Sequence, residues 1–157
     1  MLKIQMTDSQ ELAMAIYMAN MYFYQKIEPK DGMPQILHSI RVMLAGKTTV
    51  EQTVGMLHDT VEDTAITLRD LKAWGFSDSV VEAVEALTRK EDESYEVYLQ
   101  RIQASGPLAV AVKIHDLTDN IDRPAPINES PDVSMKRKAK YIRARSMLEA
   151  RPFLQNL

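Results

Sequence analysis

Apolar residues recur every three or four positions along most of the chain, which is the spacing of one buried face of an α-helix. The spacing is clearest in two segments, 50–61 and 110–121, where valine, leucine and isoleucine return on one face. No stretch alternates apolar and polar residues convincingly enough to predict a β-strand. The pattern therefore predicts an all-α fold of about seven or eight helices.

Capping residues, glycines and prolines set the boundaries of these predicted helices. Thr7 and Gln10 form a capping-box pattern that opens a helix to about residue 27, and Thr49 with Gln52 forms a second such pattern. Pro34 suits the first turn of a helix that Gly46 closes. Further helices are expected over 67–75, 77–87, 94–104, 107–121 and 132–150, with a turn at 28–32 and a loop at 123–131.

The apolar run 12–24 needs a separate interpretation, because it resembles the core of a signal peptide. Asp8 and Glu11 precede it against a single Lys3, and Asn20 interrupts it, which argues against a signal. At 13 residues the run is also too short to span a bilayer. We expect a buried helix here.

Composition and charge narrow the class of protein. The chain has 157 residues with no repeat, low-complexity tract or linker, so residues 1–157 are expected to form one domain. A net charge of −3 gives no general attraction to nucleic acid or to anionic membranes, so any phosphate site has to be local. The absence of cysteine excludes disulfides and zinc–thiolate sites and fits a reducing compartment, so we expect a cytoplasmic protein.

The candidate chemistry centres on the three histidines. Asp59 directly follows His58, and Asp116 directly follows His115. The remaining histidine, His38, lies twenty residues before the first pair. Such histidine–aspartate pairs, each with a further carboxylate three or four residues on, indicate a metal site built for hydrolysis.

Two more carboxylates, Glu62 and Asp63, follow the first pair. On a continuous helix residues four apart share a face, so His58 is expected over Glu62 and Asp59 over Asp63. An imidazole and several carboxylates turned into a protein core are costly unless they bind a cation or pair with each other. The segment 58–63 therefore predicts a buried ion site, and a solvated polar face at a helix end is the simpler alternative.

The second pair lies on a helix whose inner face carries Lys113 and Asp116. His115 points about 100° away from Asp116, so we expect it at the surface or behind the ligands, with a role as ligand in place of Asp116 as the alternative. Asp119 lies close by, and it can also simply pair with Lys113 or Arg123.

The mixed nitrogen and oxygen ligands are His38, His58, Asp59 and Asp116. This set suits Mn²⁺, Fe²⁺, Co²⁺, Ni²⁺ or Zn²⁺ better than Mg²⁺ or Ca²⁺. Such a metal lowers the pKa of its bound water and polarises a phosphoryl oxygen. Glu62 and Asp63 would then orient the water or move its proton. His38 taken alone is more often an ordinary core or surface histidine.

The order of these ligands resembles the HD superfamily of metal-dependent phosphohydrolases. The sequence GMLHDTVEDT (55–64) resembles the LLHDxxEDT motif of the hydrolase domain in RelA/SpoT proteins and their small stand-alone relatives. VKIHDLTDN (112–120) resembles the KLADRxHN segment of that family, and GMPQILHSIRV (32–42) resembles GxPYxxHPxxV. LTRKEDESYEVYLQRI (87–102) is similar to a segment of the stand-alone bacterial members. The resemblance covers residues 10 to about 150.

The resemblance implies an all-helical domain that binds one Mn²⁺ through the four ligands above, with Glu62 and Asp63 as the catalytic acidic pair and Asn120 as a nucleotide contact. The reaction that it implies is removal of pyrophosphate from the 3′ position of guanosine tetra- or pentaphosphate. The candidate phosphate contacts are Lys30, Arg41, Arg89, Lys90 and Lys113. Tyr95 and Tyr98 are candidates to stack on a base or sugar, and simple helix packing is the alternative.

The chain departs from the family pattern where the family recognises the base. Tyr24, Lys26 and Ile27 stand where the family has a His-x-Gly-Gln stretch, and Pro29-Lys30 replaces an Arg-Lys pair whose arginine contacts guanine. Further departures are Gln35 for tyrosine, Ser39 for proline, His115 for alanine and Asp119 for histidine. The metal ligands are kept, while the residues expected to contact the base differ.

We therefore predict a metal-dependent phosphohydrolase that acts on a small phosphorylated nucleotide, with guanosine 3′,5′-bis(diphosphate) as the first candidate substrate and with no nucleic-acid or membrane partner. Another nucleotide phosphatase or pyrophosphatase of the HD superfamily is the second candidate. Two alternatives lie outside catalysis: a metal-dependent module that binds a nucleotide without turnover, and a helical domain whose ion cluster only stabilises the fold. The basic helix face at 136–140 is expected to be solvated, with a substrate contact as its alternative.

Overall fold

The computed structural model describes residues 5–28 and 32–150, and within these ranges the regular elements are helices. They are α1 (Asp8–Phe23), α2 (Ile36–Ala45), α3 (Thr49–Leu57), α4 (Thr60–Asp63), α5 (Leu68–Ala73), α6 (Asp78–Leu87), α7 (Tyr95–Ser105), α8 (Pro107–Asp122) and α9 (Pro131–Glu149). The predicted all-α class is confirmed. The described residues contain one short element more than expected, because the helix predicted through Val61 is interrupted after Leu57.

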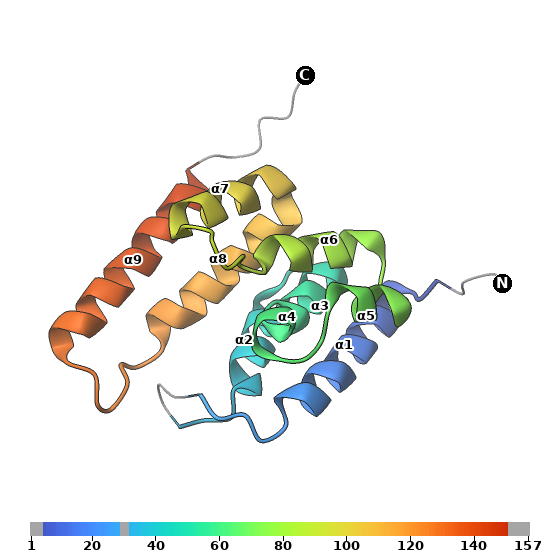
Figure 1. The fold of residues 1–157 in the computed structure, drawn as a ribbon, viewed down its shortest axis with the longest axis horizontal. Helices are drawn as coiled ribbons and strands as arrows, with labels where there is room; N and C mark the ends of the chain where they lie inside the picture. Colours follow the sequence, from blue (N-terminus) through green and yellow to red (C-terminus); the bar gives the residue numbers. More distant parts are fainter. Residues whose placement is uncertain (1–4, 29–31, 151–157) are drawn as a thin grey trace.

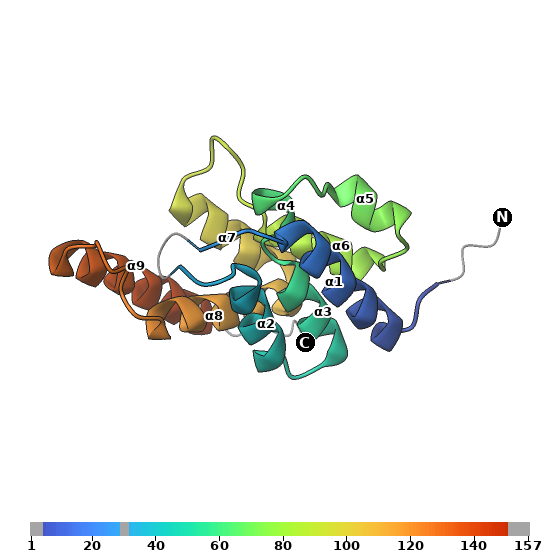
Figure 2. The ribbon, with the colours of Figure 1, turned by 90° about the horizontal axis from the view of Figure 1, so that it is seen from below.

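Helices α3 and α8 form the centre of the molecule. α3 packs against α1, α2, α6 and α8, and α8 also packs against α7 and α9. Figures 1 and 2 show α8 and α9 as an antiparallel pair at the end of the molecule opposite α1 and α5. Five consecutive residues of α3, Thr53 to Leu57, are buried, so this helix is enclosed on all sides at its C-terminal end. Side chains at that end therefore project into the interior.

Gly55 allows α2 and α3 to approach backbone to backbone. A Cβ atom at this position would lie 3.1 Å from the backbone nitrogen and Cα of Met43 and 3.2 Å from the carbonyl carbon of Val42. These distances are tighter than ordinary carbon contacts, and the neighbouring atoms belong to the backbone and cannot swing away. The absent side chain thus sets the spacing between the helix that carries His38 and the helix that precedes His58.

The turn between α3 and α4 corrects the prediction of one continuous helix through residue 61. The Thr60 hydroxyl donates to the carbonyl of Leu57 at 2.7 Å, and the Asp59 backbone has φ −100° and ψ −1°, away from regular helix geometry. In a continuous helix, neighbouring side chains diverge by about 100°. Here the turn brings His58 Nε2 and Asp59 Oδ2 to 3.2 Å. Adjacent residues therefore point at one location.

Two predicted helix ends also differ in the structure. α1 has the predicted capping box of Thr7 and Gln10, but it ends at Phe23 because the chain turns at Gln25 (φ 66°) and then forms a bridge between Ile27 and Pro34.

The cap of α3 lies one residue earlier than predicted. Thr48, in place of Thr49, accepts a hydrogen bond from the Glu51 N–H, while the Gln52 side chain donates to the Gly46 carbonyl.

α1 is held to α6 by a buried carboxylate. Glu11 is 3% exposed and accepts hydrogen bonds from the Ser77 backbone N–H at 2.7 Å and from the Ser77 hydroxyl at 3.1 Å. Ser77 precedes α6, so the negative charge also lies at the positive end of that helix dipole. The apolar run 12–24 lies in and just beyond α1 and contributes Ala15, Met18, Ala19 and Phe23 to the core. Within the described ranges, no helix has the length and apolar content to cross a membrane.

Candidate functional site

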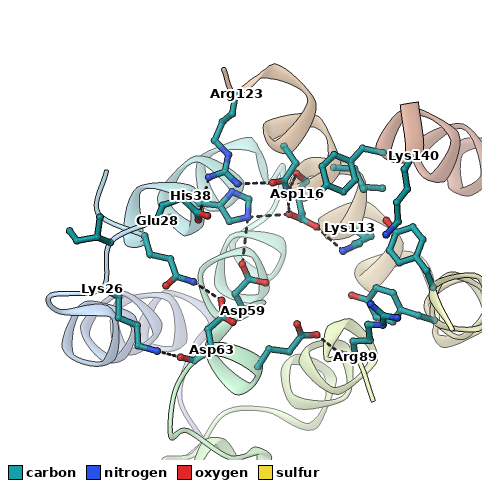
Figure 3. Close-up of a pocket in the computed structure, with 18 residues that line it drawn as sticks. Lys26, Glu28, His38, Asp59, Asp63, Arg89, Lys113, Asp116, Arg123 and Lys140 are labelled. Carbon is teal, nitrogen blue, oxygen red and sulfur yellow. Dashed lines mark hydrogen bonds and ion pairs between the residues drawn. The ribbon is translucent and has the colours of Figure 1, made fainter. Parts of the chain in front are cut away.

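A cavity of about 690 Å³ opens beside the junction of α2, α3 and α8. Its lining comes from α2 and the segment before it, from Asp59 and α4, from Arg89 just after α6, and from helices α7, α8 and α9. Figure 3 shows His38 and Asp116 together in the interior, with Lys113, Lys140 and Arg89 on one side and Lys26 on the other. Elements from both halves of the sequence therefore meet here.

All four predicted metal ligands converge at the floor of this cavity. His38 Nε2 lies 3.2 Å from His58 Nε2 and 3.6 Å from Asp59 Oδ2. Asp116 Oδ1 lies 3.1 Å from His38 Nε2 and 3.8 Å from His58 Nε2. Ligands that each bind one ion at about 2.0–2.2 Å are separated by about 3–3.6 Å. Three of the four observed distances lie in that range, and the fourth, 3.8 Å, lies just above it.

The tautomers of the two histidines provide a test of whether a cation fits. His58 Nδ1 lies 2.7 Å from the Gly55 carbonyl, which can only accept, so the proton is on Nδ1. His38 Nδ1 lies 2.6 Å from an Asp119 carboxylate oxygen and donates to it. In the neutral rings both Nε2 atoms therefore carry lone pairs, and these face each other beside two carboxylates. The arrangement fits a divalent transition-metal ion.

The electrostatics of the cluster point the same way. Burial alone would lower the pKa of His38, but hydrogen bonds with Asp116 and Asp119 and the charges of Asp116 and Asp59 outweigh it and raise the pKa to about 9. The carboxylates thus create a strong attraction for positive charge at a ring that is 4% exposed. Either a proton or a metal ion can satisfy this attraction.

Asp116 is held in place by two residues that were predicted as substrate contacts. Its Oδ2 accepts from the Lys113 ammonium at 2.8 Å, and its Oδ1 accepts from the Asn120 amide at 2.6 Å. Burial would raise the pKa of Asp116, but the charge of Lys113 and the hydrogen bond with His38 keep it well below its usual range. Asp116 is therefore an ionised, oriented carboxylate, and Lys113 and Asn120 also line the cavity.

The acidic pair Glu62 and Asp63 lies beside the cluster and lines the same cavity. Glu62 accepts a hydrogen bond from the backbone N–H of Arg89, and Asp63 accepts one from the Gln35 amide. Partial burial raises the pKa of Glu62 above its usual range against the opposing bond from Arg89. Partial burial and the charge of Asp59 likewise raise the pKa of Asp63. A raised pKa is typical of carboxylates that exchange protons with a substrate.

The remaining predicted substrate contacts divide into three groups. Arg89 and Tyr95 line the cavity. Arg41 lies outside the lining and pairs with Asp119, with Nε to Oδ1 at 2.5 Å and Nη2 to Oδ2 at 3.1 Å. Lys30 falls outside the described residues.

Lys90, another candidate phosphate contact, lines a smaller hollow next to Arg89. His115 points away from the cluster, with Nε2 3.7 Å from Glu51.

An aromatic wall with two lysines was only partly predicted. The rings of Tyr95 and Tyr98 lie 6.1 Å apart, Lys113 Nζ lies 5.0 Å from the Tyr98 centroid, and Lys140 Nζ lies 4.0 Å from the Tyr95 centroid. Tyr141 also lines this wall. Basic residues crowd 136–140, and nothing in that pattern singles out Lys140 as the lysine that lines the cavity.

Comparison with known proteins addresses the fold. No family model matches the chain, and no curated protein matches it in sequence. A solved structure matches the chain in fold. It is a metazoan ortholog of SpoT, described as hydrolyzing ppGpp, and it superposes with a TM-score of 0.70 at 18% identity over 89% of this chain and 92% of that chain. The two chains share one fold. That shared fold agrees with the all-helical class predicted from the sequence.

Proposed function

We propose that the protein is a metal-dependent phosphohydrolase acting on a phosphorylated nucleotide, and that 3′-pyrophosphate removal from guanosine 3′,5′-bis(diphosphate) is the first reaction to test. The observation that carries the proposal is the pair of Nε2 lone pairs facing each other beside two carboxylates at the floor of a cavity. The chain shares its fold with a SpoT ortholog that hydrolyzes ppGpp, and this supports the choice of substrate class. A cavity of about 690 Å³ is of the size that small-molecule sites have.

Mn²⁺ is the proposed ion, held by His38, His58, Asp59 and Asp116. The two imidazoles and two carboxylates suit a first-row transition metal. Such an ion can also bind a water molecule and a phosphoryl oxygen, which are the two groups that react in phosphate hydrolysis. When bound, the ion supplies Lewis-acid polarisation of a phosphoryl oxygen and access to a water nucleophile at neutral pH.

Glu62 and Asp63 are the proposed proton acceptors. Glu62 uses Oε1 for the Arg89 N–H, so the bond fixes the carboxylate while its second oxygen takes no part in it. The raised pKa values of both carboxyls make them better bases once ionised. Both lie on α4, directly after Asp59, and both line the cavity, which supports this role.

The cations of the opposite wall are the proposed phosphate contacts. Lys113 and Lys140 flank the tyrosine pair, and Arg89 lines the cavity on the same side. Charge-assisted hydrogen bonds from such groups to phosphate oxygens are among the stronger polar contacts in proteins. Tyr95 offers a ring face on which a base or sugar could stack, and the Lys140 ammonium lies 4.0 Å from the centre of that ring.

A second candidate is another nucleotide phosphatase or pyrophosphatase of the same fold. It is favoured by the segment before α2, where Lys26 donates to the Asp63 carbonyl and Glu28 pairs with Arg123 at 3.4 Å. These contacts occupy side chains in the region where the family recognises guanine. Which nucleobase the protein recognises is therefore a question for the substrate panel.

Release of phosphate and pyrophosphate with added Mn²⁺, across guanosine tetraphosphate and a panel of other nucleotides, tests the proposal. Pyrophosphate from guanosine tetraphosphate supports the first candidate. Release from another nucleotide alone supports the second. A protein that binds Mn²⁺ and nucleotide but releases no product from any of them contradicts both, and indicates a binding module.

A further inference from the structure

Asp119 lies at the centre of a group of contacts that joins α2 to α8. Its Oδ2 is 2.6 Å from His38 Nδ1, and its two oxygens accept from Arg41 Nε and Nη2 at 2.5 and 3.1 Å. Arg123 Nε lies 3.3 Å from Oδ2. The Asp119 side chain is 12% exposed, so these groups, not solvent, surround most of it.

One helix, α8, contacts both nitrogens of the His38 ring. Asp116 and Asp119 are three residues apart on α8 and so project from the same side. Asp116 lies at Nε2 and Asp119 at Nδ1 of the same imidazole. α8 therefore supplies both a metal ligand and the group that orients a ligand from another helix.

We propose that Asp119 is a positioning residue for the metal centre, which holds His38 as the Nδ1–H tautomer and keeps its Nε2 lone pair directed at the ion. The inference rests on the metal site of the proposed function. A carboxylate that accepts the second ring proton of a ligating histidine fixes the ring and strengthens the ligand. The matching family position is a histidine, so the role comes from this chain's own residues.

Arg41 gains a different role from this geometry. It lies three residues after His38 on α2, and its bidentate bond fixes both oxygens of Asp119. We therefore assign Arg41 to the support of Asp119 and not to substrate phosphate. The closer of its two contacts is with Oδ1, and Oδ2 is the oxygen that accepts the hydrogen bond from His38 Nδ1.

The test measures Mn²⁺ affinity by calorimetry for the unmodified chain and for Asp119→Ala, Asp119→Asn and Asp122→Asn. Asp119→Ala is expected to bind Mn²⁺ about 10- to 100-fold more weakly, the usual cost of losing such a partner. Asp119→Asn is also expected to weaken Mn²⁺ binding, because it removes the charge that strengthens the His38 hydrogen bond and, since both carboxylate oxygens accept from N–H donors, it turns an amide N–H₂ toward at least one of those donors. An amide N–H₂ that faces His38 Nδ1 favours the Nε2–H tautomer, whose Nε2 has no lone pair for the ion.

Asp122→Asn is the matched control, since it removes the same charge from an exposed position on the same helix and is expected to leave Mn²⁺ affinity unchanged. A second readout is the His38 Nδ1 proton in the Zn²⁺-loaded protein by NMR. A 2.6 Å hydrogen bond to a carboxylate predicts a low-field, slowly exchanging signal that Asp119→Ala abolishes. A general loss of structure would not remove this one signal from an otherwise native spectrum.

Affinity equal to that of the unmodified chain in Asp119→Ala or in Asp119→Asn would overturn the positioning role while leaving the metal site intact. Equal losses in Asp119→Asn and Asp122→Asn would overturn it too, because charge alone would then explain the effect. If the unmodified chain binds no Mn²⁺ or Zn²⁺, the metal site of the proposed function fails and this role fails with it. If Asp119→Ala does not fold, the nearly isosteric Asp119→Asn decides the question.

Discussion

The floor and the wall of the cavity hold their side chains in different ways. At the floor, His38, His58 and Asp116 are 3–5% exposed: His38 donates to Asp119, His58 donates to the Gly55 carbonyl, and Asp116 accepts from Lys113. On the wall, Arg89 and Lys140 belong to more open surroundings, one beside a loop and one on an exposed turn of α9. Both regions face the same space.

This difference separates two tasks that a hydrolase has to perform. A buried, tightly oriented set of ligands fixes the geometry around an ion, because any displacement is opposed by packing and by several hydrogen bonds. Exposed cations contribute attraction for phosphate but little geometric constraint. We therefore expect substitutions at the floor to remove binding of the ion, and substitutions on the wall to change the preference among substrates.

The largest effect is expected from removing a floor ligand. Asp59→Ala should lose metal and activity together, with Mn²⁺ affinity falling by more than the roughly 100-fold that a supporting partner costs. Calorimetry and product release on the same preparation measure the two losses. An active variant with normal Mn²⁺ affinity would remove Asp59 from the ligand set.

Glu62→Gln should separate binding from turnover. The substitution keeps the shape of the side chain and removes its basicity, so Mn²⁺ affinity should stay within about twofold while kcat falls by about 10²- to 10⁴-fold. Single-turnover rates with saturating Mn²⁺ give the direct comparison. Loss of Mn²⁺ together with activity would place Glu62 among the ligands and not beside them.

A wall cation should show the opposite division. Lys140→Ala removes the ammonium over the Tyr95 ring, so KM should rise by about tenfold while kcat and Mn²⁺ affinity are unchanged. Lys138→Ala is the matched control, because this residue lies two positions earlier and so projects from nearly the opposite side of α9. Steady-state kinetics at several ionic strengths measure the effect, and equal KM values in both variants would exclude a phosphate contact at Lys140.

The smallest effect is expected behind the wall, where Arg101 binds Glu93 at 2.7 and 2.8 Å and also donates to the carbonyls of Ala86 and Thr88. The hydrogen bonds from Arg101 lower the pKa of Glu93 to about 2, so the ionised carboxylate stabilises the fold above the usual glutamate range near 4.5. This stabilisation should be lost as the pH falls from about 4.5 toward 2. Glu93→Gln should lack this pH-dependent part of the free energy of unfolding. Urea unfolding of the unmodified chain and of the variant, each at pH 7 and pH 3, measures the difference. Parallel pH profiles for both chains would contradict the role of the pair.

Sequence pattern predicts the floor well and the wall poorly, for a physical reason. His58 and Asp59 are neighbours in the chain, and Asp116 repeats their pattern, so local spacing is enough to identify them. Even so, the pattern missed the turn that makes the pair converge, because the Thr60 side chain sets it through a hydrogen bond to Leu57.

Contacts over long distances in the chain were not accessible in the same way. The Asp119 bond joins residues 81 positions apart, and the orientation of Lys140 depends on how α9 packs against α8. Helical periodicity places such residues on a face of their own helix but does not say which helix lies opposite. Arg41 shows the consequence, since its charge predicted a phosphate contact and the packing of α2 against α8 gives it a carboxylate.

The most direct test of the account is pyrophosphate release from guanosine 3′,5′-bis(diphosphate) by chelator-treated protein as Mn²⁺ is added back. The account predicts no release without metal, saturable recovery with Mn²⁺, and a midpoint that matches the Mn²⁺ affinity measured by calorimetry. Release that does not depend on Mn²⁺ would contradict the central claim that the ion at the floor of the cavity is required for hydrolysis.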